Sequence, residues 1–119
     1  MLEKTSGFAK IYVAPGYTDL RAGIETLAAK VRSEFRLDPY EKNVLFLFCG
    51  RRTDRIKGLL WEGNGFLLLY KRFESGSLQW PRTPGEAMKI TPDQYHLLLR
   101  GFRIVAAHPV QDIRPTGLV

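Results

Sequence analysis

Cationic and aromatic side chains concentrate in the middle of the chain, and their types and spacing are the ones that suggest chemistry. The candidate nucleic-acid-binding side chains are Arg51, Arg52, Arg55, Lys57, Lys71, Arg72 and Arg82. The candidate aromatic contacts are Trp61, Tyr70 and Trp80. Cationic side chains neutralise phosphates and release counterions, while flat rings stack on bases. This combination favours contact with nucleic acid. Two alternatives stay open: a solvated corner with the rings in the core, or a surface for a protein partner.

The charge distribution favours a polyanion as the partner. The 119 residues carry a formal net charge of +6. Residues 50–82 hold seven lysines and arginines against three acidic residues, Asp54, Glu62 and Glu74, so +4 of the total falls in this segment. Clustered positive charge attracts polyanions and speeds their association. The segment, rather than the chain as a whole, is the predicted contact.

Residues suited to catalysis or metal binding are scattered along the sequence. The two histidines, His96 and His108, are twelve positions apart, with no cysteine or carboxylate at the spacing of a zinc site. A metal-dependent nuclease needs two or three carboxylates that converge on divalent ions. The candidates Asp19, Asp54 and Glu62 fall on expected turns or element ends instead. We therefore expect no catalytic residue, no metal site, no cofactor and no enzymatic activity.

A β-hairpin is predicted to carry most of the cationic and aromatic residues. Two apolar and aromatic runs, residues 56–62 and 66–73, flank an Asn-Gly pair at 64–65. Asn-Gly is the strongest short-range signal for a hairpin, because both residues tolerate the positive φ of a type I′ turn. With this pair as the turn, Lys57 lies opposite Arg72. The predicted sheet then has a cluster of cations along one edge.

Two helices are predicted, one before the hairpin and one after it. The apolar residues at helical spacing in the first are Leu20, Ile24, Leu27 and Val31. They predict one long helix over about residues 19–35, with Thr18 as its cap. Residues 91–94 combine a capping threonine, proline at the first helical position and glutamine three residues after the cap. They predict a short C-terminal helix, which Gly101 ends.

The remaining apolar runs complete a sheet. Residues 44–49 are six apolar residues in a row, which predicts a strand buried on both faces, and residues 9–13 predict another strand. We expect the long helix to contact Leu45 or Phe46. The predicted fold class is α+β: a small antiparallel sheet with a central β-hairpin, one long N-terminal helix packed on it and a short C-terminal helix.

Length and composition predict one soluble domain. We expect residues 1–119 to form a single domain, with a core at about residues 8–102 and a mobile C-terminal tail at about 103–119. Cys49 is the only cysteine, so no internal disulfide can form and a reducing compartment is expected. We expect neither a leader sequence nor a membrane span, because no apolar run approaches the roughly 18 residues that a span needs.

Several short motifs follow one another within about residues 10–102. They are Thr18-Asp19-Leu20-Arg21, Gly50 to Lys57, Trp61 to Phe66, Tyr70-Lys71-Arg72, Trp80-Pro81 and Thr91 to Leu99. In this order they resemble TnpB, the accessory protein encoded by the second open reading frame of bacterial insertion sequences of the IS-sixty-six type. That family is distinct from the RNA-guided nucleases that share its name. The resemblance implies a role in transposition beside a separate transposase, and it assigns no catalytic residue.

Residues and resemblance together predict a non-catalytic accessory factor for the transposition of a bacterial insertion sequence. We expect it to bind DNA, the transposase of the same element, or both, through the basic and aromatic hairpin. The alternative is a bridging or regulatory partner of the transposase that makes no nucleic-acid contact. Because two apolar hairpin faces leave surplus surface, a weak homodimer is also expected. The expected location is the bacterial cytoplasm, without membrane contact.

Overall fold

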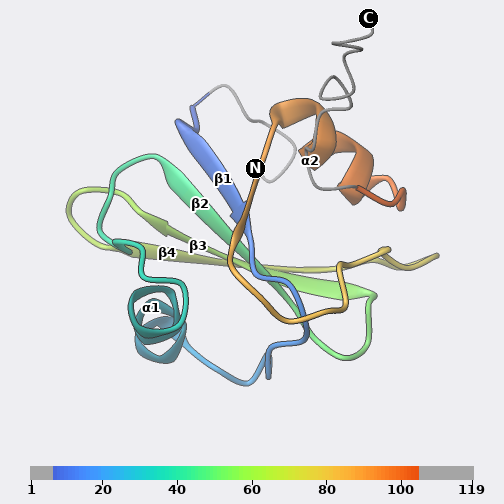
Figure 1. The fold of residues 1–119 in the computed structure, drawn as a ribbon, viewed down its shortest axis with the longest axis horizontal. Coiled ribbons are helices and arrows are strands. Elements are labelled where there is room, and N and C mark those ends of the chain that lie inside the picture. Colours follow the sequence, from blue (N-terminus) through green and yellow to red (C-terminus); the bar gives the residue numbers. More distant parts are fainter. Residues whose placement is uncertain (1–6, 105–119) are drawn as a thin grey trace, which may run out of the picture.

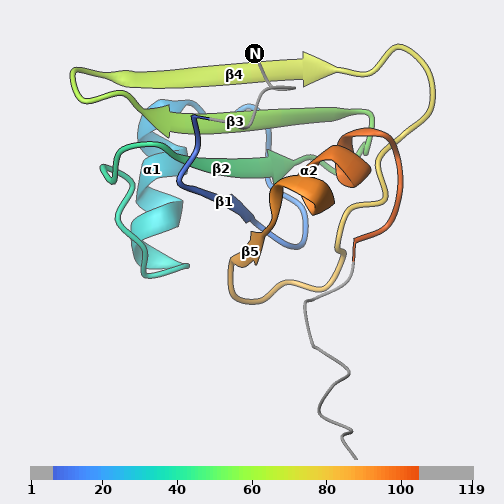
Figure 2. The same cartoon turned by 90° about the horizontal axis from the view of Figure 1, so that it is seen from above.

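The computed structural model describes residues 7–104, which form a mixed five-stranded sheet between two helices (Figure 1). In chain order the elements are β1 (Lys10–Val13), α1 (Ile24–Ser33), β2 (Val44–Cys49), β3 (Arg55–Trp61), β4 (Phe66–Arg72), β5 (Met88–Ile90) and α2 (Pro92–Leu99). The strands lie side by side in the order β4-β3-β2-β1-β5 (Figure 2). Most of the expected tail, residues 105–119, lies outside the described residues, whereas Ile104 is buried.

The first two strands, β1 and β2, pair in parallel, with Ile11 opposite Leu45. The other pairings in the sheet are antiparallel. A parallel pair needs a crossover connection, and the segment that contains α1 supplies it. The prediction of an antiparallel sheet is therefore wrong. Local sequence dictates the direction of the hairpin strands, but the direction of β2 relative to β1 depends on the path of residues 14–43.

The N-terminal helix is shorter than predicted, so the long helix over residues 19–35 is a second error. Helix α1 has ten residues and begins after Gly23, with no side-chain cap. Thr18 does not cap it, because Thr18 is buried and its backbone N–H donates to the Cys49 carbonyl at 2.8 Å. This bond ties the start of the predicted helix to the end of β2. Residues 18–22 consequently form a loop.

The predicted hairpin is present as β3 and β4, but it lies at one edge of the sheet and not at its centre, and its turn is shifted by one residue. Gly63 and Asn64 are the turn residues, because the Glu62 N–H donates to the Gly65 carbonyl at 2.9 Å. Gly63 has a φ of +94°, and glycine at the first turn position is the pattern of a type II′ turn. The predicted type I′ turn at 64–65 is wrong. Asparagine lies between two glycines, so the sequence permits either turn.

The shifted turn moves each hairpin partner by two residues. Lys57 lies opposite Tyr70, and Arg55 lies opposite Arg72. The predicted pairing of Lys57 with Arg72 is therefore wrong. The two side chains still share a face, because a shift of two residues preserves the alternation of side chains along a strand.

The sheet separates two hydrophobic clusters. On one face, Leu27 and Val31 of α1 pack with Phe46 and other residues of the sheet, which confirms the expected contact of the N-terminal helix with Phe46. On the opposite face, the buried cluster includes Ile11, Leu45, Leu47, Ile56, Leu78, Trp80, Tyr95 and Leu98. Helix α2 and residues 78–80 therefore cover much of the second hairpin face. The surplus apolar surface from which a homodimer was expected is correspondingly reduced.

Thr91 caps α2 and Gly101 follows its end with a φ of +90°, so the C-terminal helix is confirmed. The Thr91 hydroxyl accepts from the Gln94 N–H at 3.1 Å, and the Gln94 side chain accepts from the Thr91 N–H at 2.8 Å.

We expect Thr91→Ala to lower the free energy of unfolding by about 1 kcal/mol, because one N–H at the helix start loses its partner. Urea denaturation measures this change. The control is Thr83→Ala in an exposed loop, and equal stability of both variants would contradict the capping role.

Candidate nucleic-acid interface

The parallel pairing of β1 and β2 brings two loops together at one end of the sheet. Because both strands run in the same direction, the loops that follow them, residues 14–23 and 50–54, leave from the same end. Strand β3 starts there and β4 finishes there, since each pairs antiparallel with its neighbour (Figure 2). An open hollow of about 570 Å³ lies at this end. We call it the arginine–tyrosine groove, and its long side chains are Tyr17, Arg21, Arg51, Arg52, Arg55 and Tyr70.

The first loop is fixed against the sheet. Besides the bond from Thr18 to the end of β2, the Nζ of Lys57 donates to the Ala22 carbonyl at 2.9 Å. Gly50 is buried under this loop, and a Cβ at Gly50 would lie 3.1 Å from the Cγ of Leu20. Such a distance is shorter than an ordinary van der Waals contact. Glycine at this position thus lets the two loops approach each other.

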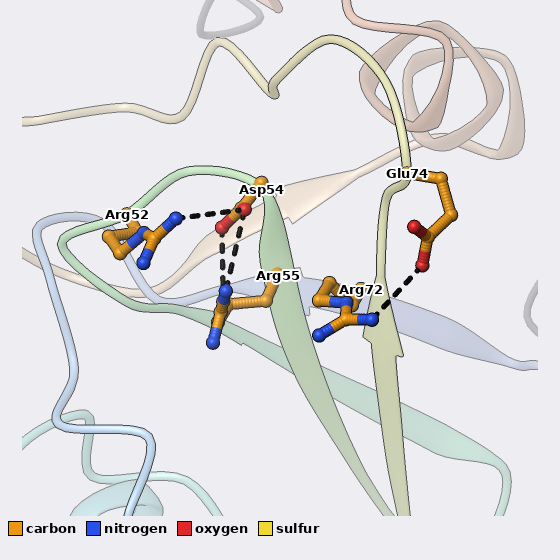
Figure 3. Close-up of polar contacts among 5 residues, drawn as sticks. All are labelled: Arg52, Asp54, Arg55, Arg72 and Glu74. Carbon is orange, nitrogen blue, oxygen red and sulfur yellow. Dashed lines mark hydrogen bonds and ion pairs between the residues drawn. The ribbon is translucent and has the colours of Figure 1, made fainter.

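Asp54 holds two arginines of the groove in place (Figure 3). Its carboxylate lies 3.0 Å from the Nε of Arg55 and 3.7 Å from the guanidinium of Arg52. The hydrogen bond between Arg55 and Asp54 lowers the pKa of Asp54 and raises the pKa of Arg55. Arg72, opposite Arg55 in the hairpin, pairs with Glu74 at 3.4 Å. Since like charges placed opposite each other repel, these carboxylates offset a repulsion that is built into the strand pair.

Asp19 and Arg21 form a further ion pair in the first loop. Arg21 donates from Nη2 and Nε to the carboxylate, at 2.7 Å in the shorter contact, and its backbone N–H donates at 3.0 Å. These hydrogen bonds lower the pKa of Asp19 to about 2. The contribution of this carboxylate to stability is therefore complete above its ordinary pKa of 3.8 and is lost as the pH falls through about 2. Both side chains are exposed, so solvent screens the pair.

Four of the seven predicted cations, Lys57, Lys71, Arg72 and Arg82, lie outside the groove lining. Lys57 is half-buried and is used in the bond to the first loop. Lys71 is on the opposite face of the sheet, with its Nζ 5.2 Å from the centre of the Phe73 ring. Arg82 lines a separate hollow of about 530 Å³ together with Arg103. The groove therefore unites Arg51, Arg52 and Arg55, and Arg72 adjoins them from β4.

The three predicted rings also separate. Tyr70 lines the groove and is 53% exposed. Trp61 lies at the far end of the hairpin, where its ring packs edge-on against Tyr40. Trp80 is buried and its Nε1 donates to the Ala14 carbonyl at 2.9 Å, so it belongs to the core. Of the candidate stacking rings, Tyr70 is the one that the fold places beside the arginines.

Sequence reasoning misses two residues of the groove, Tyr17 and Arg21. Arg21 belongs to the motif at residues 18–21 and Tyr17 adjoins it. The resemblance to TnpB implies no contact for this motif. The available signal is that residues 18–21 and 50–52 each follow an apolar strand. A parallel pairing of those strands would place the two segments side by side, but no local feature of the sequence favours it over an antiparallel one.

Acidic residues do not converge in the part of the chain that the structure describes. No group of three or more histidine, cysteine, aspartate or glutamate side chains could hold a metal ion within residues 7–104. Asp54 immediately precedes β3 and Glu62 immediately follows it, so the length of the strand separates these two candidates. Within the same residues, neither helix is long and apolar enough to cross a membrane.

Cys49 is fully buried at the end of β2, and burial raises the pKa of its thiol to about 12. We expect the native protein to resist labelling by a disulfide reagent such as Ellman's reagent at about pH 8, because the thiolate is the reactive form. The unfolded chain should react with one equivalent, since it has one cysteine. Absorbance of the released thiolate measures both rates. Equally fast labelling of the native and unfolded protein would contradict the buried position.

The chain is similar to known proteins over most of its length. The family described as IS66 Orf2 like protein matches residues 9–109, which include both loops of the groove. Two proteins of Sinorhizobium fredii (strain NBRC 101917 / NGR234) are similar over nearly their whole length. Uncharacterized protein y4hO is 37% identical over 107 residues, which are 90% of each chain. Uncharacterized protein y4jC is 35% identical over 109 residues, which are 90% of this chain and 91% of its own. No solved structure shows significant similarity.

The match confirms the resemblance that the motifs suggested. It spans most of the chain, and the relatives share more than a third of their residues with it over that span. The chain belongs to the IS66 Orf2-like family of insertion-sequence accessory proteins.

Proposed function

We propose that the chain is a non-catalytic accessory factor in the transposition of its insertion sequence, and that it binds DNA through the arginine–tyrosine groove and the adjoining Arg72. Family membership supports a role beside a transposase. The observation that carries the DNA contact is the meeting of two separate motifs, residues 18–21 and 50–57, in one hollow.

The electrostatics of the groove suit phosphate. Four arginines line it, and three of them pair with carboxylates: Arg21 with Asp19, and Arg52 and Arg55 with Asp54. Arg51 has no carboxylate within ion-pair distance among residues 7–104. Arg52 is 76% exposed and its contact with Asp54 is long, at 3.7 Å. Because exposed ion pairs contribute little to stability, a phosphate can take up both guanidinium groups with little loss.

A second candidate function is a protein bridge. The guanidinium groups of Arg21 and Arg55 already bind carboxylates within the chain, and this geometry would equally suit an acidic segment of the transposase. In that case the chain would regulate or connect transposase subunits without touching nucleic acid.

The two functions are separated by titrating the protein into a fluorescein-labelled duplex that carries one end of the element, at several salt concentrations. DNA binding predicts that log affinity falls linearly with log salt, by about 0.9 for each phosphate neutralised. An unrelated duplex of the same length measures specificity. Absence of binding even at low salt, together with retention of the transposase on the immobilised chain, would overturn the DNA contact and favour the bridge.

The non-catalytic character is tested with the same DNA. We expect duplex and supercoiled DNA to remain uncut after incubation with the protein and Mg²⁺ or Mn²⁺. Metal-dependent nicking that disappears in Asp54→Asn or Glu62→Gln variants would overturn this part of the proposal.

A further inference from the structure

Two exposed tyrosines lie on the surface of the groove. Tyr17 is 39% exposed and Tyr70 is 53% exposed, and both line the groove. Tyr40 is similarly exposed, at 47%, but its ring packs on Trp61 and Phe66. Among residues 7–104, neither Tyr17 nor Tyr70 has another aromatic ring as a partner. Both rings are therefore partly exposed to solvent within the groove, and the Arg51 guanidinium lies over one face of the Tyr17 ring.

Each tyrosine has an arginine beside it. The guanidinium of Arg51 lies 5.8 Å from the centre of the Tyr17 ring. On the other side, Arg55 is in the same hollow as Tyr70, which lies opposite Lys57 in the hairpin. Asp54 keeps Arg55 in position and Arg55 is 28% exposed, whereas no carboxylate among residues 7–104 pairs with Arg51. The two exposed rings and the exposed Arg51 together resemble a binding surface more than a packed corner.

Flat rings next to arginines are the arrangement that binds single strands. Unpaired bases present their faces for stacking, while the arginines follow the phosphates. Bases of a duplex are stacked on one another, so their faces are closed to side chains. A hollow of about 570 Å³ also falls within the size of sites that hold one ligand of nucleotide dimensions.

We infer that the arginine–tyrosine groove binds single-stranded nucleic acid, with unpaired bases stacked on Tyr70 and Tyr17 and the intervening phosphates held by Arg51 and Arg52. This inference rests on the proposed function in one respect, that nucleic acid is the ligand. The inference adds that the bound strand is unpaired and that Tyr17 and Tyr70 both stack on its bases. Arg55 has a positioning role, because its partner Asp54 holds it beside Tyr70.

The test compares one sequence of about fifteen nucleotides in three forms: single-stranded DNA, single-stranded RNA and duplex DNA, each labelled with fluorescein. Fluorescence anisotropy gives the dissociation constants for the parent and for Tyr17→Ala, Tyr70→Ala and Tyr70→Phe. The control is Tyr40→Ala, which removes an equally exposed tyrosine outside the groove. Thermal unfolding confirms that each variant is folded. The DNA and RNA arms identify which kind of strand is preferred.

We expect at least one single strand to bind more tightly than the duplex. Tyr17→Ala and Tyr70→Ala should each weaken single-strand binding about tenfold or more, within the range that stacking of one base supplies. Tyr70→Phe should bind like the parent, because phenylalanine keeps the stacking face. The Tyr40→Ala control should also bind like the parent.

Two results would overturn the inference, and they have different consequences for the proposed function. Equal or tighter binding of the duplex, with no effect of either tyrosine variant, would exclude the stacking groove but leave the arginines as a duplex contact. Failure of all three nucleic acids to bind at low salt would overturn the inference and the DNA-binding function together. Retention of the transposase by the same protein would then identify the groove as a protein surface.

Discussion

Replacing Arg51 and Arg52 together by alanine should flatten the salt dependence of duplex DNA binding by nearly two units. Each phosphate that a protein neutralises contributes about −0.9 to the slope of log affinity against log salt, so the loss of two contacts changes the slope by about 1.8. Both arginines are exposed. Their loss should leave the core intact, and we expect the thermal unfolding of the double variant to match that of the parent.

The matched control for this variant is the pair Lys42→Ala and Lys89→Ala. These lysines are also exposed, and Lys89 lies on β5, at the opposite edge of the sheet from β4. The control removes the same charge from the chain, so it measures the effect of net charge alone. If the arginine variant and the lysine control have the slope of the parent, the loop at residues 50–54 that carries Arg51 and Arg52 is a solvated corner. The accessory role would then depend on protein contacts.

Trp80→Ala should destabilise the protein by about 3–5 kcal/mol, the range measured for large aromatic side chains removed from a core. Trp80 is 4% exposed and lies in the cluster that α2 covers. Its Nε1 also satisfies the carbonyl of Ala14, which would lose its partner in the variant. The neighbouring segment is fixed as well, because the Leu78 N–H donates to the Thr53 carbonyl at 2.7 Å.

Urea denaturation of three variants separates this structural role from a stacking role. Trp80→Phe should lower the free energy of unfolding less than Trp80→Ala does, since phenylalanine keeps most of the buried ring area but not the hydrogen bond. Trp61→Ala is the control for the loss of a half-buried tryptophan, and it should destabilise less than Trp80→Ala. A Trp80→Ala protein as stable as the parent but defective in nucleic-acid binding would contradict the core position of this residue.

Features with local signals could be predicted from the sequence. The start of α2 depends on residues 91–94 alone, and the buried strand depends on the apolar run at 44–49. The hairpin likewise follows from two apolar runs around a glycine-rich turn. Its register could not be fixed, because Gly63-Asn64 and Asn64-Gly65 are both acceptable turns and differ by a one-residue shift.

Features that depend on distant backbone contacts could not be predicted. Thr18 has the side chain of a helix cap, but its N–H donates to the carbonyl of Cys49, at the end of β2. The sequence offers no sign of that bond, so the helix was expected to begin too early. The direction of β2 depends on the same contacts, and the predicted antiparallel sheet failed for this reason.

Some residues of the candidate site could likewise be predicted from local sequence, and others could not. Arg51, Arg52, Arg55 and Tyr70 could be selected because the turn and the hairpin place them near one another. Tyr17 lies far from them in the sequence, and only the parallel pairing of β1 with β2 brings it to the groove.

We propose that this accessory protein acts in transposition by holding nucleic acid in its groove beside the transposase. Co-purification of the tagged chain with the transposase of its own element, with and without element-end DNA, tests it most directly. We expect DNA to increase the amount of transposase recovered, and the double variant Arg51→Ala, Arg52→Ala to abolish this increase. Equal recovery of the transposase without DNA, unchanged by the arginine variant, would contradict it.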